Sequence, residues 1–89
     1  MLTLNNFEDE VNGTILQRGR SYFKQHAIID LEMTSDDTWV AEVEGTDIYQ
    51  VEVTLKNNDE ITEFYCDCPY DGDVCKHVVA VFYELREAV

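Results

Sequence analysis

The chain has 89 residues, of which 45% are hydrophobic and 11% aromatic, the size and composition of one folded domain with a modest core. Six Lys and Arg residues against 19 Asp and Glu residues give a formal net charge of −13. This composition excludes a disordered chain of low hydrophobicity. The charge disfavours nucleic acid as a partner, because Lys and Arg must neutralise its phosphates. No stretch has the pattern of a secretory signal or a membrane span, so we expect a cytoplasmic protein that does not contact membranes.

The first part of the chain, residues 1–27, carries apolar residues at helical spacing. The stripe consists of Phe7, Val11, Ile15, Leu16, Tyr22 and Phe23. Asn5 or Asn6 is suited to cap the start of a helix here. Gly13 lies within the stripe and can divide it into two helical pieces, and the sequence leaves both arrangements open.

Between residues 28 and 65 the apolar period changes from about 3.6 to 2, which predicts strands. Three runs alternate: Ile29, Leu31 and Met33; Trp39, Ala41 and Val43; Tyr49, Val51, Val53 and Leu55. The turns between them are predicted at Ser35-Asp36-Asp37, Gly45-Thr46-Asp47 and Asn57-Asn58-Asp59. A fourth strand is predicted from Glu60 to Tyr65, and sequential antiparallel pairing follows.

The last part, residues 66–89, returns to the helical period. Val78, Val81, Phe82 and Leu85 have the spacing of a buried stripe, and Asp73 is placed to cap the helix. The predicted fold class is α+β, with an N-terminal helix, an antiparallel sheet of three to four strands and a C-terminal helix. We expect residues 1–89 to form a single domain.

Four potential metal ligands lie within twelve residues: Cys66, Cys68, Cys75 and His77. A disulfide framework is disfavoured, because three cysteines cannot all pair and Cys66 and Cys68 have one residue between them. Three thiolates and one imidazole fill the tetrahedral shell of one zinc ion and leave no place for a catalytic water. We therefore expect a structural zinc site and no enzymatic activity.

The chain geometry favours the same site. Cys66 and Cys68 are alternate residues at a strand end, so both thiols can point the same way. Pro69, Asp71 and Gly72 are suited to reverse the chain. Cys75 and His77 then lie at or near the first turn of the last helix, whose dipole stabilises thiolate.

The spacing Cys-x-Cys, six residues, Cys-x-His resembles the SWIM zinc finger, including the proline after Cys68 and the lysine between Cys75 and His77. The resemblance implies a strand–strand–helix arrangement around one zinc ion, with the same four residues as ligands. Arg18-Gly19, Tyr22-Phe23 and the hairpin from Gly45 to Val53 resemble the segment that precedes the finger in bacterial SWIM proteins. SWIM domains occur in Swi/Snf-type ATPases and Mutator-type transposases, and the family is inferred to bind DNA or proteins.

We expect a zinc-dependent module that contacts a protein partner, within a nucleic-acid-processing protein such as a Swi/Snf-type helicase. Direct DNA binding, which the resemblance suggests, and thiol redox chemistry remain as alternatives. Arg18, Arg20 and Lys24 form the one basic cluster and offer a phosphate contact, although balancing nearby acids explains them more simply.

Seven other side chains complete the sequence-based interpretation. Glu42, Glu44 and Glu52 are predicted to face away from the core and to form an acidic sheet face that suits a basic partner. Trp39 and Tyr49 lie at the alternate strand positions that are predicted to face the core, and they are interpreted as packing residues. His26 is interpreted as a surface or helix-capping residue. Lys76 is interpreted as a positive charge that balances the negative charge of the neighbouring thiolates.

Overall fold

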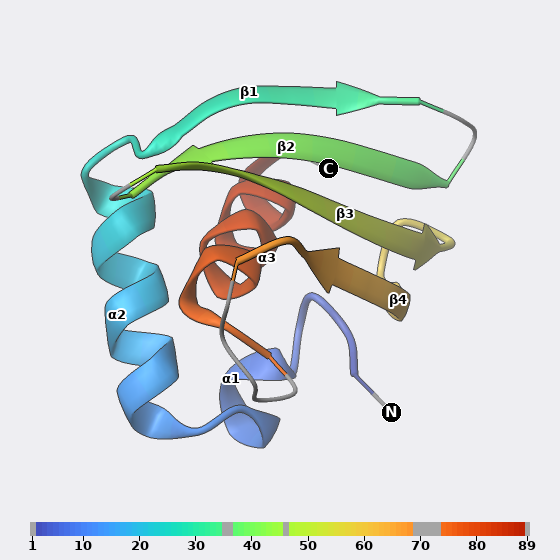
Figure 1. Ribbon diagram of the computed structural model, residues 1–89. Coiled ribbons are helices and arrows are strands. Elements are labelled where there is room, and N and C mark those ends of the chain that lie inside the picture. Colours follow the sequence, from blue (N-terminus) through green and yellow to red (C-terminus); the bar gives the residue numbers. More distant parts are fainter. Residues whose placement is uncertain (1, 35–36, 46, 69–73, 89) are drawn as a thin grey trace.

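The computed structural model describes residues 2–34, 37–45, 47–68 and 74–88 and shows the predicted α+β fold (Figure 1). Within these ranges the elements follow in the order α1 (Phe7–Glu10), α2 (Gly13–Lys24), β1 (Ile28–Met33), β2 (Thr38–Glu44), β3 (Ile48–Lys56), β4 (Glu60–Cys66) and α3 (Lys76–Ala88). The turn predictions at Ser35, Asp36 and Thr46, the chain reversal at Pro69 to Gly72 and the cap at Asp73 lie outside the described residues.

The N-terminal stripe forms two helices, which settles the arrangement that the sequence left open. The side chain of Asn12 accepts hydrogen bonds from the backbone N–H groups of Thr14 and Ile15 and so caps α2. Asn6, one of the two predicted cap residues, occupies the N-cap position of α1, but its side chain makes no capping hydrogen bond to that helix.

Helix α2 ends in a Schellman motif centred on His26. This residue has a φ of 58°, the left-handed conformation that such an ending requires. The N–H of His26 donates to the carbonyl of Phe23, and the N–H of Ala27 donates to that of Tyr22. His26 is exposed, so its interpretation as a surface residue at a helix end is confirmed.

The four strands form one antiparallel sheet in the order β1-β2-β3-β4, so each strand pairs with its neighbour in sequence. The inward side chains of Val43, Val51 and Val53 are fully buried. Asn57 and Asn58, with φ values of 57° and 58°, form the turn between β3 and β4, as residues that tolerate the left-handed region do.

Strand β1 departs from the alternation predicted for it. Ile29 and Met33 are 50% and 52% exposed, whereas Ile28 packs against the core. The register shifts between Ile28 and Asp30, and a one-residue shift exchanges the faces to which side chains point. Because β1 is an edge strand of the described sheet, its side chains have neighbouring strand residues on the β2 side only.

Helices α2 and α3 lie on the same side of the sheet (Figure 1). Between sheet and helices lies a core that includes Phe7, Leu55, Phe82 and Leu85, each no more than 1% exposed. The N-terminal segment joins the other edge of the sheet, because the N–H of Leu4 donates to the carbonyl of Asp59. The opposite face of the sheet carries no helix in the described part of the chain.

Candidate metal centre

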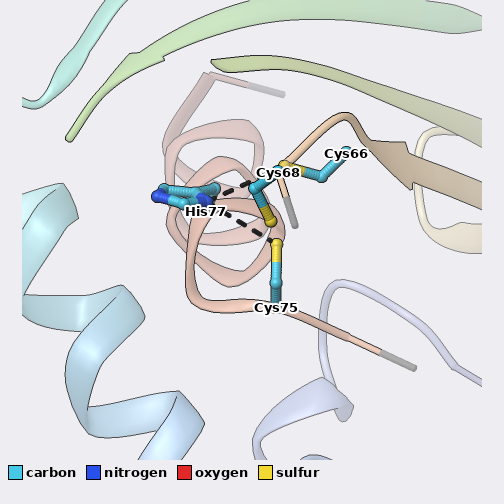
Figure 2. Close-up of side chains that lie close together, drawn as sticks. All are labelled: Cys66, Cys68, Cys75 and His77. Atoms are coloured by element: carbon cyan, nitrogen blue, oxygen red, sulfur yellow. Dashed lines mark hydrogen bonds between the residues drawn. The ribbon is translucent and has the colours of Figure 1, made fainter. Parts of the chain in front are cut away.

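The end of β4 and the start of α3 bring the four predicted ligands together. Cys66 is the last residue of β4, and Cys68 lies two residues later. Cys75 directly precedes α3, and His77 lies in the first turn of that helix. Figure 2 shows the three sulfur atoms and the imidazole turned toward one another. One ligand atom from each residue can be chosen so that all four lie within 4.8 Å of one another.

The distances around His77 fit a zinc ion. Its Nδ1 atom lies 3.7 Å from the Sγ of Cys66 and 3.8 Å from the Sγ of Cys75. With ordinary Zn–S and Zn–N bond lengths, a tetrahedral site separates a sulfur and a nitrogen ligand by about 3.6 Å. Nδ1 is therefore the histidine atom placed to bind the metal.

The electrostatics of the thiols also suit a divalent cation. The hydrogen bond from the Cys66 thiol lowers the pKa of Cys75 to about 4, and the His77 side chain acts in the same direction. The pKa of Cys66 is raised above its ordinary value, first because its proton is shared with Cys75 and then because of burial. The two thiols share one proton, so both ionise only when a cation takes the place of that proton. Zinc supplies this positive charge.

A bound zinc ion would join β4 to α3 as a cross-link. All three cysteines are free thiols in the structure. Zinc favours thiolate and imidazole ligands, and four protein ligands complete its tetrahedral shell. The site thus has the ligand set of a structural zinc centre.

Three residues that surround His77 were not identified as part of the site from the sequence. Tyr22 and Tyr49 place their rings 5.3 Å and 4.5 Å from the imidazole, measured between ring centroids. Gly45, between β2 and β3, lies beside the Nε2 atom of His77. The apolar stripes indicated burial for both tyrosines, and nothing in their spacing pointed to His77.

The other charged residues lie outside the ligand cluster. The Nζ atom of Lys76 lies 5.6 Å from the centroid of the Tyr22 ring, a cation–π contact that the sequence did not predict. Arg18, Arg20 and Lys24 are exposed on α2. His26 is not among the clustered ligands.

The comparisons with known proteins match the part of the chain that contains the ligand cluster to a family. The SWIM zinc finger family matches residues 51–86, which contain all four ligands. No curated protein and no solved structure matches the chain. In the described residues, no helix is long and apolar enough to cross a bilayer. Residues 51–86 of this chain therefore match the SWIM zinc finger family, and Cys66, Cys68, Cys75 and His77 are positioned to bind one zinc ion.

Proposed function

We propose that this protein is a zinc-dependent interaction module that binds a basic segment of a partner protein through the outer face of its sheet. The outer sheet face is the side opposite the helices and is formed by Asp30, Glu32, Val40, Glu42, Gln50, Glu52, Glu63 and Tyr65. The observation that carries the proposal is the charge of this face.

Cross-strand pairing places these carboxylates beside one another. Asp30 is directly opposite Glu42, and residues in such positions point to the same face. Glu52 is opposite Tyr65 on β4. All five acidic residues of the face are exposed.

The outer sheet face lacks basic residues that would balance the charge of its carboxylates. Lys56 is the only basic residue of the four strands, all of which the structure describes, and it lies at the far end of β3 opposite Glu60. Like charges placed directly opposite on a sheet, such as Asp30 and Glu42, are destabilising. A partner rich in Lys and Arg would relieve this repulsion, whereas a polyanion would add to it.

A shallow hollow on the outer sheet face offers a place for a basic side chain. It has a volume of about 240 Å³ and is lined by Glu52, Thr54, Glu63, Phe64 and Tyr65. Tyr65 is 58% exposed. An aromatic ring beside two carboxylates can bind a Lys or Arg side chain by cation–π and ionic contacts together.

In this proposal the zinc ion is structural and the protein is not an enzyme, because four protein ligands leave no open position for a substrate. The cytoplasm is the proposed location, since it keeps ligand thiols reduced. A larger nucleic-acid-processing assembly, such as one built on a Swi/Snf-type helicase, is the proposed setting.

Fluorescence anisotropy with a labelled peptide rich in Lys and Arg tests the proposal. We expect saturable binding that weakens with salt, and a loss of about tenfold in affinity for Glu52→Lys, equivalent to roughly 1.4 kcal/mol. Glu87→Lys is the matched control, because it makes the same charge change at an exposed position of α3. Equal effects of the two variants would contradict a binding site on the sheet.

Direct DNA binding is a second candidate, and the position of the basic cluster favours it. Arg18, Arg20 and Lys24 are exposed on α2, in the helical layer on the side of the sheet opposite the acidic face. A gel-shift titration across salt concentrations distinguishes the two functions. Tight binding of the wild-type protein to a DNA duplex, lost in Arg20→Ala and retained in Glu52→Lys, would favour the DNA function over the protein-binding one.

A further inference from the structure

The imidazole of His77 is enclosed on the side away from the sulfur atoms. Its Nδ1 atom faces Cys66 and Cys75. The Nε2 atom is buried and has no hydrogen-bond partner among the described residues, and the whole side chain is only 4% exposed. A histidine that binds metal through one nitrogen is oriented by what surrounds the other.

Gly45 makes room for this arrangement. A Cβ atom added at Gly45 would lie 3.3 Å from each of three atoms: Nε2 of His77, the hydroxyl oxygen of Tyr22 and Cε2 of Tyr49. None of the glycines in the described residues has a positive φ, so the backbone at Gly45 does not itself require glycine. The close packing of the three rings accounts for it.

The rings of Tyr22 and Tyr49 flank the imidazole from two elements. Tyr22, on α2, meets it edge-on at an interplanar angle of 72°. Tyr49, on β3, lies across it at 32°. These two tyrosines and Gly45 all precede residue 51, where the family match begins.

We infer that Tyr22 and Gly45 are positioning residues of the zinc centre. The ring of Tyr22 and the absence of a side chain at Gly45 hold the imidazole with Nδ1 toward the thiolates and Nε2–H away from water. The metal centre therefore extends beyond the matched finger, and α2 and the β2–β3 turn are part of it. This inference rests on the zinc site and is independent of the partner protein proposed to bind the outer sheet face.

Cobalt substitution tests the inference, because the absorption bands of Co²⁺ report the geometry of its ligands. We expect Gly45→Ala and Tyr22→Ala to weaken Co²⁺ and Zn²⁺ binding about tenfold or more in chelator competition and to shift the visible bands. Tyr22→Phe keeps the ring, so it should retain most of the affinity.

Two control variants separate positioning from general destabilisation. Gly13→Ala makes the same change at the start of α2, where an added Cβ meets no atom within 4 Å. Phe23→Ala removes an aromatic ring from the same helix, one that stacks on Tyr83 rather than on His77. Both controls should leave the cobalt bands unchanged, even where Phe23→Ala lowers the stability of the fold.

The tautomer of His77 gives a measurement on the unaltered protein. In the zinc-loaded protein, two-bond ¹H–¹⁵N correlations should show the metal on Nδ1 and the proton on Nε2. Metal binding through Nε2 would overturn the inference, as would a Gly45→Ala variant whose cobalt bands and affinity match those of Gly13→Ala. If no metal bound at all, the zinc site itself would be wrong, which is a distinguishable result.

Discussion

Gly19 is the residue that lets α2 approach α3. It is the one buried residue of α2, and a Cβ atom built on it would overlap the side chain of Val79 and lie 2.9 Å from the carbonyl oxygen of Lys76. Lys76 is the first residue of α3 and lies between two zinc ligands. A side chain at Gly19 would therefore press on the helix end that carries His77.

We predict that Gly19→Ala destabilises the protein by about 1 to 3 kcal/mol, the usual cost of overpacking a close contact. Urea denaturation followed by circular dichroism measures the change. Gly13→Ala serves as the control, because that position has open space around it and alanine favours helix over glycine. If the two variants were equally stable, the close approach of the helices would not require glycine.

At the scale of elements, Glu8 links α1 to α3. Its carboxylate accepts hydrogen bonds from Arg86 at 2.7 Å and from the Tyr83 hydroxyl at 2.9 Å. The hydrogen bond from Arg86, followed by that from Tyr83, lowers the pKa of Glu8 below its ordinary value of 4.5. Because the folded state has the lower pKa, the ionised carboxylate stabilises the fold above about pH 4.5, and this contribution is lost as the pH falls through the lowered value.

We predict that Glu8→Gln lowers the free energy of unfolding by about 0.5 to 1 kcal/mol at neutral pH, the range for a largely exposed ion pair. The difference between variant and wild type should shrink as the pH falls through the lowered pKa of Glu8, since the wild-type carboxyl is then protonated as well. Urea titrations at a series of pH values measure this difference. Asp9→Asn, at an exposed position of the same helix, is the control; a difference that stays constant with pH would argue against the ion pair.

At the scale of the whole molecule, a bound zinc ion would add a cross-link to a fold whose core already packs α3 against the sheet. Structural zinc contributes an apparent binding energy of about 10 to 16 kcal/mol in small peptides, as much as the stability of a whole domain. The ligands come from the end of β4 and the start of α3. Metal loss should therefore free α3 from the sheet and disturb α2, which packs against it.

We predict one zinc ion per chain by native mass spectrometry and a large loss of helical circular dichroism after treatment with a strong chelator. Restoring zinc should restore the signal. Thiol alkylation should be slow in the zinc-loaded protein and fast after chelation, because bound thiolates are protected. A protein that stays folded without metal, with cysteines reactive in both states, would instead support the redox alternative.

The sequence by itself determined the ligand set and the order of elements. Cys66, Cys68, Cys75 and His77 are close along the chain, so a strand end, a short connection and a helix start suffice to bring them together. The change of apolar period predicted the strands and the last helix, because burial of one face imposes a period of 2 on a strand and 3.6 on a helix.

Only the tertiary structure decided which residues surround the site. Tyr22 and Gly45 meet His77 across more than thirty residues of sequence, and no local pattern records such a contact. The register shift that packs Ile28 against the core and exposes Ile29 depends on pairing with β2. The preference of a segment for helix or strand depends on residues that are neighbours in sequence. Contacts between distant segments depend on how several elements pack around one core, so these contacts form only when the chain folds.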